Sequence, residues 1–214
     1  DYLDVLPVDY IDIEKVEADD VISFLAQGLA KRNSKVKIIS TDKDFLQLVH
    51  PNISVHNPVS KKTYTIDNVE DEIKVPPVNY LIAKALVGDS SDNLSGIKGL
   101  GIKTLVKKIP EILEKKLTLE DVYLLAEQRL DEGKIFARII HDWLKVETNY
   151  NIMNLEESFL TDKQKLSIVE TLKSPAKELH SGAILHYLEK DNIERLSNNA
   201  DSWLFEFKYL TSLK

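Results

Sequence analysis

The stretch VKIISTDKD, residues 36–44, places two carboxylates directly after a run rich in β-branched residues. Such a run predicts a buried strand, and the apolar residues between Asp19 and Arg32 recur at helical spacing. The segment YIDI at Tyr10–Ile13 predicts a further short strand before that helix. A strand, a helix and a strand within about 30 residues form a βαβ unit. We therefore expect an α/β fold with a partly parallel sheet, right-handed crossovers and flanking helices.

The pattern changes from strands to helices further along the chain. We expect a helical turn at Phe45–Val49 and strands at Ile53–His56 and Lys62–Thr65. Beyond the prolines at positions 76 and 77 the spacing is helical. The expected helices are Val78–Val87, Leu105–Lys115, Leu119–Arg129, Gly133–Thr148, Thr161–Leu172 and Lys177–Glu189.

These patterns divide the chain into two regions, an α/β portion at residues 1–75 and a helical region at residues 76–214. The last stretch, Asp201–Leu210, carries aromatic residues at alternating positions. We expect it to be a terminal segment that docks on the core.

Composition narrows the class of protein. The 214 residues include no cysteine, which excludes disulfides and zinc held by thiolates. No apolar run approaches the roughly 20 residues that span a bilayer, and the N-terminal residues lack a signal-peptide pattern. We expect a protein of the cytoplasm, in a bacterial or phage-infected cell, with no membrane contact.

The formal net charge of −7 is the wrong sign for coating nucleic acid by bulk electrostatics. Any nucleic-acid contact therefore needs a local basic patch. Such a patch lies between Ser95 and Lys116, where six lysines stand against two glutamates: Lys98, Lys103, Lys107, Lys108, Lys115 and Lys116.

Carboxylates gather in three short motifs: EADD at residues 17–20, TDKD at 41–44 and GDSSDN at 88–93. Each alone has a structural explanation, because acidic residues favour helix N-termini and Asp-rich turns are common on surfaces. TDKD follows a strand, however, and ligands of open α/β sheets lie beyond the carboxyl ends of strands. So many carboxylates at one sheet edge would raise each other's pKa unless cations neutralise them.

Ligation by oxygen alone favours Mg²⁺, with Mn²⁺ as a substitute, over zinc. Two such ions roughly 3.5–4 Å apart would suit hydrolysis of a phosphodiester, one activating water and one stabilising the leaving oxygen. That chemistry needs many carboxylates and no nucleophilic serine or cysteine.

The segment GIKGLGIKT, residues 96–104, follows the third motif directly. Its glycines at 96, 99 and 101 permit positive φ and close backbone approach. The spacing departs from the phosphate-binding loop pattern, because position 102 is isoleucine where that pattern needs lysine. The glycines and lysines fit a hairpin that grips a DNA backbone without reading bases, and an ordinary turn between helices is the alternative.

The order EADD, TDKD, GDSSDN and GIKGLGIKT resembles the 5′ nuclease family. This family includes flap endonucleases, the 5′–3′ exonuclease domain of bacterial DNA polymerase I, and phage enzymes including one called ribonuclease H. The match covers about half of the chain, from Leu6 to Ile109, and the phage type is most similar. The resemblance implies a PIN-like nuclease core and a helix-hairpin-helix at about residues 88–109.

The resemblance also implies roles for residues. By the resemblance, the catalytic residues of this chain are Glu17, Asp19, Asp42, Asp44 and Asp92. The metal ligands are these five residues together with Asp20 and Asp89. The DNA-binding residues are Gly96, Lys98, Gly99, Gly101, Lys103, Thr104 and Lys107, and carbonyls of residues 99–102 would line the loop that holds a K⁺ ion. The implied partners are branched or nicked duplex DNA, 5′ flaps, RNA-primed DNA and replication accessory proteins.

The expected function is Mg²⁺-dependent 5′–3′ exonuclease or flap endonuclease activity in replication, primer removal and repair. The family begins with a strand that carries an essential aspartate, then a second aspartate and a helical arch, and none of these precedes Asp1. We therefore expect weak or absent activity from these residues alone. A DNA-binding module without catalysis and a Mg²⁺-dependent phosphatase remain as alternatives, and only the phosphatase has no need of the glycine hairpin.

Overall fold

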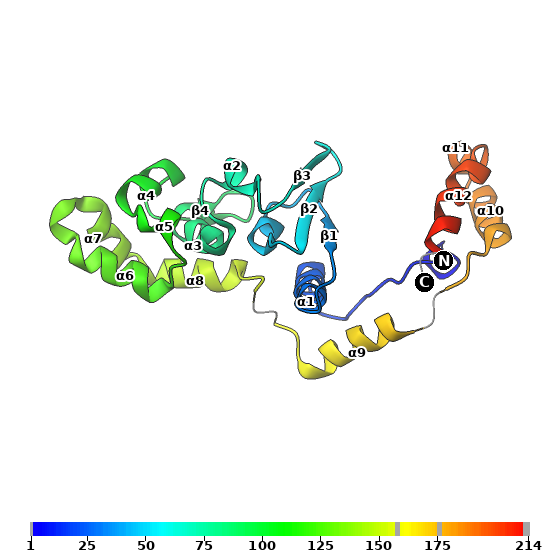
Figure 1. Cartoon of the computed structure of the whole chain (residues 1–214), viewed down its shortest axis with the longest axis horizontal. Coiled ribbons are helices and arrows are strands. Elements are labelled where there is room, and N and C mark those ends of the chain that lie inside the picture. Colours follow the sequence, from blue (N-terminus) through cyan, green and yellow to red (C-terminus); the bar gives the residue numbers. More distant parts are fainter. Residues whose placement is uncertain (1, 157–158, 175–176, 212–214) are drawn as a thin grey trace. The chain divides into compact units, whose positions relative to one another are not determined.

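A computed structural model describes residues 2–156, 159–174 and 177–211 of the chain (Figure 1). The chain divides into two compact units, one of residues 18–159 and one that combines residues 1–17 with 160–214. Each unit is described by itself. Among the described residues, no helix combines the length and apolar character that a bilayer span requires.

The larger unit contains a three-stranded sheet with the order β1-β2-β3. Its strands are β1 (Val36–Ile39), β2 (Ile53–Asn57) and β3 (Lys62–Tyr64). β1 and β2 are parallel, with Val36 opposite Ile53, whereas β2 and β3 are antiparallel. The partly parallel sheet expected from the sequence is therefore confirmed.

Helices connect and flank this sheet. Helix α1 (Ala18–Lys31) precedes β1, and the 3₁₀ helix η2 (Asp44–Leu48) lies between the two parallel strands. The ring of Phe45 and the side chain of Leu46 are almost fully buried, which fixes η2 against the core. Because η2 begins at Asp44, the second carboxylate of TDKD lies on its first turn.

The strand expected at Tyr10–Ile13 is wrong, since these residues form no strand. The βαβ unit around α1 is wrong for the same reason. Tyr10 is 47% exposed, and its ring lies 4.7 Å from the ammonium of Lys177 in the smaller unit. Residues 10–13 thus belong to the smaller unit, where the Tyr10 ring meets a lysine in place of a neighbouring strand.

Helices dominate the rest of the larger unit. They are α2 (Val69–Ile73), α3 (Pro77–Val87), α4 (Ile102–Lys108), α5 (Glu111–Glu114), α6 (Leu119–Gln128), η3 (Leu130–Glu132), α7 (Lys134–His141) and α8 (Trp143–Met153). A short hairpin of β4 (Gly88–Asp89) and β5 (Leu94–Ser95) follows α3 directly.

Two of the expected helices are each divided into two. The helix expected at Leu105–Lys115 breaks before Pro110, which lacks the N–H that a continuing helix requires. The helix expected at Gly133–Thr148 breaks at Asp142, whose carboxylate pairs with His141 and Lys145. The backbone of Asp142 departs from helical geometry, with φ −96° and ψ 19°.

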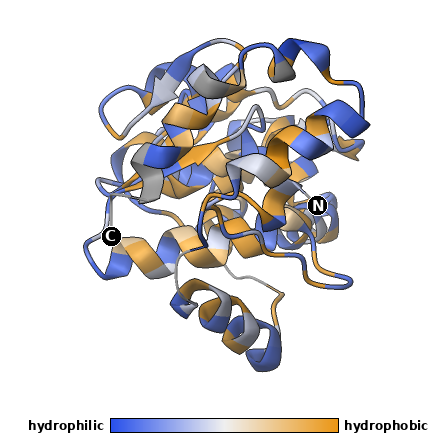
Figure 2. Cartoon of the chain, turned by 90° about the vertical axis from the view of Figure 1, so that its right-hand side faces the viewer, coloured by the Kyte–Doolittle hydropathy of each residue, from blue (hydrophilic) through white to orange (hydrophobic). Residues whose placement is uncertain are grey.

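The core of the larger unit joins the sheet to the helices. Among its fully buried side chains are Phe45, Leu86, Leu105, Phe136 and Ile139. Apolar and polar residues alternate along the individual helices and strands, as the hydropathy colours show (Figure 2). Helix α3 packs against both η2 and α8. This packing brings the hairpin after α3 close to TDKD.

The smaller unit has its own small core. Its elements are η1 (Tyr2–Asp4), α9 (Asp162–Lys173), α10 (Ser181–Lys190), α11 (Glu194–Ser197) and α12 (Ala200–Thr211). The stretch Asp201–Leu210 is helical, so Trp203 and Phe207 lie one turn apart and their rings meet edge to face at 5.0 Å. Both pack on the buried Leu204 and its neighbours, whereas Phe205 is 68% exposed.

Candidate metal centre

The TDKD turn is organised by its own side chains. The carboxylate of Asp42 accepts a hydrogen bond from the backbone N–H of Asp44 at 2.8 Å, and the Asp42 N–H donates to the Ser40 hydroxyl. The ammonium of Lys43 lies 2.8 Å from a carboxylate oxygen of Glu72, which also pairs with Lys62. Lys43 is therefore held away from the two aspartates that flank it.

The GDSSDN motif forms the β4–β5 hairpin. The carboxylate of Asp89 accepts hydrogen bonds from both the N–H and the hydroxyl of Ser91. Asn93 has a positive φ of 57°, and Gly88 has a φ of 86°. A Cβ atom on Gly88 would lie 2.3 Å from the backbone nitrogen of Gly96, so this turn requires glycine there. The turn leaves Asp92 exposed and Asp89 half-buried.

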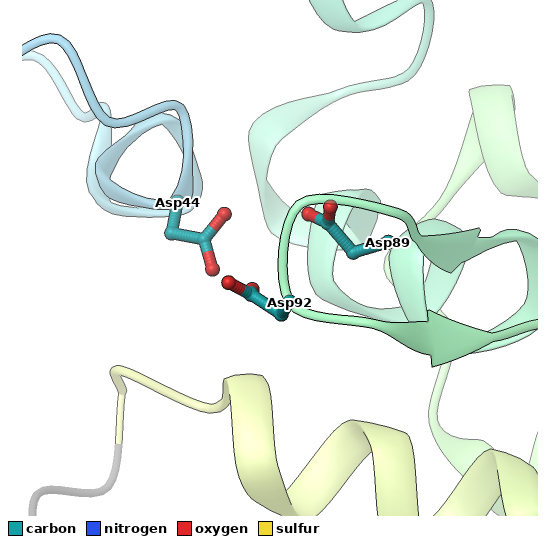
Figure 3. Close-up of side chains that lie close together, drawn as sticks. All are labelled: Asp44, Asp89 and Asp92. Carbon is teal, nitrogen blue, oxygen red and sulfur yellow. The ribbon is translucent and has the colours of Figure 1, made fainter.

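These two turns bring three carboxylates together. One oxygen each from Asp44, Asp89 and Asp92 lies within 4.8 Å of the other two (Figure 3). Asp44 comes from the start of η2 and the other two from the hairpin after α3. They line a pocket of about 470 Å³ together with Asp42 and Tyr80.

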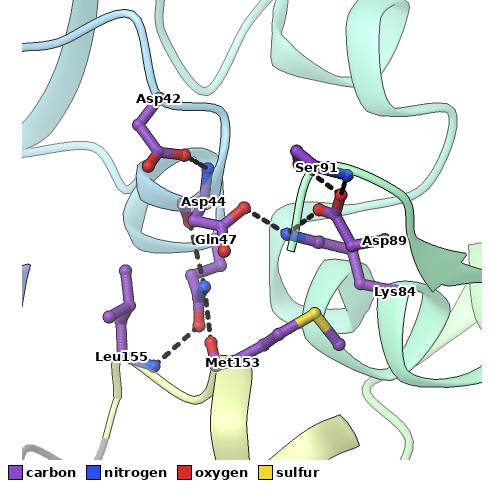
Figure 4. A network of polar contacts seen from close by, with 8 residues as sticks. All are labelled: Asp42, Asp44, Gln47, Lys84, Asp89, Ser91, Met153 and Leu155. Carbon is purple, nitrogen blue, oxygen red and sulfur yellow. Dashed lines mark hydrogen bonds and ion pairs between the residues drawn. The ribbon is translucent and has the colours of Figure 1, made fainter. Parts of the chain in front are cut away.

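A buried lysine, Lys84, completes the cluster. It lies on α3, is 7% exposed, and its ammonium pairs with both Asp44 and Asp89, at 2.6 Å from the latter (Figure 4). Two carboxylates that both lie close to a single ammonium are held near each other without a metal ion. Lys84 is therefore part of the centre, and its ammonium would compete with a metal ion for the carboxylate oxygens of Asp44 and Asp89.

The pKa values of these groups follow from burial and from Lys84. Burial raises the pKa of Asp44, and the contact with Lys84 offsets this only in part. Burial also acts to raise the pKa of Asp89, but hydrogen bonds from Lys84 and Ser91 outweigh it and lower that pKa to about 2. Burial disfavours the charged form of Lys84, yet its two carboxylate partners raise its pKa. Asp89 and Lys84 are thus held in their charged forms.

The geometry fits a hard divalent cation. Mg²⁺ binds oxygens at about 2.1 Å, so two ligands on opposite sides of the ion are about 4.2 Å apart. Among three octahedral ligands at most one pair can be opposite, and the other pairs are neighbours about 3 Å apart. The three carboxylate oxygens lie within 4.8 Å of one another, so they would have to close by up to about 2 Å, a movement that side-chain rotation can supply. Three carboxylates and one ammonium leave a local charge of −2, which a divalent cation neutralises.

The structure does not bring every expected ligand into this group. Asp42 lines the same pocket but is not one of the three clustered carboxylates. Asp19 and Asp20 lie in the first turn of α1, outside the cluster, and Asp20 accepts a hydrogen bond from the N–H of Phe159. Glu17 belongs to the smaller unit. Metal ligation by these four residues remains a prediction.

The loop between β5 and α4 presents its lysines to solvent. Ile97 and Leu100 are buried and anchor the loop, whereas Lys98 and Lys103 are exposed. Positive φ, which the sequence suggested for three glycines, occurs only at Gly99, with a φ of 82°.

The other two glycines have different surroundings. A Cβ on Gly96 would lie 2.0 Å from the carbonyl oxygen of Val87, whereas a Cβ on Gly101 would meet nothing within 4 Å. Gly96 is therefore required by close approach and Gly101 is not.

Helix α7 supports this loop. The guanidinium of Arg138 donates a hydrogen bond to the carbonyl of Lys98 at 2.9 Å. The expected loop residues Thr104 and Lys107 lie on α4, where Lys107 is exposed and Thr104 half-buried. The loop and α4 together carry a basic surface beside buried anchors.

Comparisons with known proteins agree with this arrangement. Residues 1–74 match the family described as the 5′-3′ exonuclease, N-terminal resolvase-like domain. The chain is 33% identical over 184 residues to a 5′-3′ exonuclease of Aquifex aeolicus, covering 84% of this chain and 61% of the relative. It is 35% identical over 150 residues to the flap endonuclease Xni of Shewanella woodyi, covering 69% of this chain and 59% of the relative.

The chain is thus similar to 5′-3′ exonucleases and flap endonucleases, and its residues 1–74 match the exonuclease family model. It spans about six tenths of the length of these relatives. A structure of the bacteriophage T5 5′-exonuclease has the same fold, with a TM-score of 0.64 and 21% identity over 76% of this chain and 69% of that one. A second structure of that enzyme, with divalent metal ions (zinc) bound, gives a TM-score of 0.63 at 22% identity, over 76% of this chain and 62% of that one.

The sequence patterns did not indicate two residues of the centre, Lys84 and Tyr80. Lys84 and Tyr80 are one helical turn apart on α3, and the Lys84 ammonium lies 6.0 Å from the centre of the Tyr80 ring. Burial raises the pKa of Tyr80 to about 12, so its hydroxyl stays protonated. The signal was a single lysine within the apolar run LIAKALV, which is surrounded by residues of the core.

Proposed function

We propose that this chain carries part of the metal site and the DNA grip of a structure-specific 5′ nuclease. The observation that carries the proposal is the convergence of Asp44, Asp89 and Asp92 from two motifs that are distant in sequence. The reaction would be hydrolysis of a phosphodiester near a 5′ end or flap, as the names of the relatives suggest.

The proposed cofactor is Mg²⁺, as two ions, with Mn²⁺ as a substitute. Asp44, Asp89 and Asp92 would hold one ion, and Asp42, Asp19, Asp20 and Glu17 are proposed to complete the set. The bound ions would supply activated water and stabilise the leaving oxygen. Support comes from the all-oxygen ligand set, and from a T5 5′-exonuclease of the same fold that binds divalent metal ions.

The proposed DNA grip is the loop at residues 96–104 with α4, in the role of the helix-hairpin-helix. Its exposed lysines would contact backbone phosphates, which gives affinity without sequence preference. The Lys98 carbonyl accepts a hydrogen bond from Arg138, so a K⁺ ion in this loop would depend on other carbonyls, such as those of Gly99 and Leu100.

The proposed substrates are branched or nicked duplex DNA, 5′ flaps and RNA-primed DNA, with replication accessory proteins as partners. The proposed roles are replication, primer removal and repair in a bacterial or phage-infected cell. A T5 flap endonuclease of the same fold is known in complex with DNA and metal ions, which supports a nucleic-acid substrate.

The test uses a labelled 5′-flap duplex and a linear duplex of the same sequence. Binding is measured by fluorescence anisotropy across a salt series, and cleavage is measured with Mg²⁺ or Mn²⁺ and without added metal. We expect flap binding with a steep salt dependence, and a reduction in the salt slope of about 1 for each of Lys98→Ala, Lys103→Ala and Lys107→Ala. Any cleavage should be slow, metal-dependent and abolished by Asp92→Asn.

Two results would contradict the proposal. Flap binding that is unchanged in all three lysine variants would exclude the loop as the DNA grip. Flap binding without any Mn²⁺ binding at the carboxylate cluster would instead support a DNA-binding module without catalysis.

A further inference from the structure

Helix α8 ends beside both halves of the candidate metal centre, although it contributes no carboxylate to it. It packs along α3, and residues 153–155, which we call the strap, continue from its last turn toward η2 (Figure 4). Met153 and Leu155 are buried in the core of the larger unit. The strap is therefore a fixed part of that core.

A buried glutamine joins the strap to the TDKD side of the centre. Gln47 is 4% exposed, and its side-chain nitrogen donates to the carbonyls of Asp44 at 2.9 Å and Met153 at 3.1 Å. Its side-chain oxygen accepts from the N–H of Leu155 at 3.0 Å. One amide thus spans from the backbone of a clustered aspartate to two backbone groups of the strap.

A buried asparagine joins α8 to the other side of the centre. Asn149 is 3% exposed, and its side-chain nitrogen donates to the carbonyls of Ala85 and Ser95, each at 3.1 Å. Ala85 directly follows Lys84, and Ser95 ends the strand that returns from the Asp89–Asp92 turn. Asn149 therefore holds the two chain segments that flank this hairpin.

We propose that α8 and the strap form a splint that sets the separation of Asp44 from Asp89 and Asp92. Gln47 and Asn149 are its positioning residues, because each acts through the backbone of a segment that carries clustered carboxylates. The proposal rests on the proposed metal-binding function and adds to it a pair of residues outside the carboxylate motifs.

The chemistry of the two side chains supports a positioning role. Apolar side chains would fill the same space, but they would not fix a direction, whereas an amide with both ends engaged specifies one arrangement. A buried amide that loses its partners destabilises the fold, so Gln47 and Asn149 oppose separate displacement of the segments that they join. A rigid α8 then transmits the position of one turn to the other.

The experiment compares Gln47→Met and Asn149→Leu with Gln27→Met in the full chain. Gln27 holds the same strap from α1, through the carbonyls of Leu155 at 3.1 Å and Glu156 at 3.2 Å, but it is not hydrogen-bonded to either carboxylate turn. It is the matched control for loosening the strap alone. Mn²⁺ dissociation constants are measured from the free-ion signal by electron paramagnetic resonance.

We expect Gln47→Met and Asn149→Leu each to weaken Mn²⁺ binding roughly tenfold, and Gln27→Met to leave it unchanged. In metal-free ¹H–¹⁵N spectra, the amide signals of Asp44 and Asp89 should both shift in each of the first two variants. Gln47 contacts the turn of Asp44, and Asn149 flanks the hairpin of Asp89. A shift of the amide signal in the turn that the substituted residue does not contact would show that the splint couples the two turns. Gln47→Asn, which keeps the amide on a shorter side chain, is the second variant in case Gln47→Met does not fold.

Unchanged Mn²⁺ affinity in folded Gln47 and Asn149 variants would overturn the splint, provided that the wild-type chain binds Mn²⁺ through Asp44 and Asp92. An equal loss of affinity in Gln27→Met would also overturn it, since a loose strap alone would then be sufficient. Absence of Mn²⁺ binding by the wild-type chain would instead count against the proposed function. The spectral shifts test the splint even in that case.

Discussion

Lys84 lies on α3 among apolar side chains, and its ammonium contacts two of the three clustered carboxylates. A cation in this position lowers the electrostatic cost of bringing Asp44 and Asp89 together during folding. It also occupies oxygens that a metal ion needs. The balance between Lys84 and a divalent ion therefore determines how the centre behaves with and without metal.

Replacing Lys84 should show whether this lysine and a divalent ion compete for the same carboxylate oxygens. We expect Lys84→Met to lower the free energy of unfolding without divalent ions by on the order of 2 kcal/mol, because two nearby carboxylates lose their counter-ion. Added Mg²⁺ should recover more stability in the variant than in the wild-type chain. Urea unfolding with and without Mg²⁺ measures both effects. The same loss at all Mg²⁺ concentrations would show that metal and lysine do not share these oxygens.

The ion pairs around Glu72 give a prediction about pH. Hydrogen bonds from Lys43 and Lys62 lower the pKa of Glu72 from 4.5 to about 2. Because the pKa in the folded chain is the lower one, this contribution to stability is full above about pH 4.5 and is lost as the pH falls toward 2. A carboxyl titration followed by NMR should show a midpoint near 2.

The matched variants for this titration are Lys43→Met and Lys62→Met. Each should raise the Glu72 midpoint, since each removes one of its two ammonium partners. A Glu72 midpoint that is unaltered by both substitutions would mean that the pairs do not form in solution.

The aspartates of the centre were predictable because TDKD follows a strand and GDSSDN precedes a glycine-rich loop. Lys84 was not, since a lysine in a helix usually extends to solvent, and only the packing of α3 between η2 and α8 buries it. The spacing of apolar residues along one segment does not indicate which other segments pack against it.

At the scale of elements, the β4–β5 hairpin and the following loop depend on close backbone contacts. Gly96 lies so close to the carbonyl of Val87, at the end of α3, that a Cβ atom would not fit between them. We call this contact, where the chain leaves the hairpin and enters the loop, the crossing point. The position of Asp89 and Asp92 therefore depends on a glycine that lies outside their own motif.

Paired alanine substitutions test this crossing point. We expect Gly96→Ala to lower the free energy of unfolding by about 3 kcal/mol or more, because its Cβ would overlap a backbone carbonyl. Gly101→Ala should change it by no more than about 1 kcal/mol, since φ there is −88° and the space is open. Thermal and urea unfolding of both variants provide the comparison. Equal losses at the two positions would contradict this account of the crossing.

Most elements were predictable from apolar spacing, and the failures have local causes. The helix expected to run through Pro110 ends there because proline lacks a donor. The one through Asp142 is interrupted by that residue's backbone, at φ −96° and ψ 19°. The expected strand at Tyr10–Ile13 is absent because this segment lies in the smaller unit with the C-terminal residues, which its own apolar spacing does not indicate.

At the scale of the whole molecule, the chain has two compact units whose division the sequence patterns did not indicate. The N-terminal residues pack with the C-terminal helices, for example through the N–H of His180 and the carbonyl of Val5 at 3.0 Å. Contacts between the two ends of a chain leave no periodic signal. The four carboxylates of TDKD and GDSSDN, in contrast, all lie in the larger unit.

This division predicts that residues 18–159 fold by themselves. The fragment should keep the helical circular dichroism of that unit. At the site of Asp44, Asp89 and Asp92, which it contains whole, its Mn²⁺ affinity should stay within about threefold of the full chain, a difference of about 0.7 kcal/mol. A much larger loss in a folded fragment would show that Glu17 or another residue of the smaller unit contributes a ligand. Calorimetric titration of both proteins with Mn²⁺ distinguishes these results.

The central claim is that Asp44, Asp89 and Asp92 form one site for a divalent cation. The most direct measurement is Mn²⁺ binding, by calorimetry and electron paramagnetic resonance, to the wild-type chain and to Asp44→Asn, Asp89→Asn and Asp92→Asn. Asp67→Asn, at an exposed turn after β3, is the charge-matched control. We predict saturable binding that each of the three variants weakens at least about tenfold and the control leaves unchanged. No saturable binding, or equal weakening in all four variants, would contradict the claim.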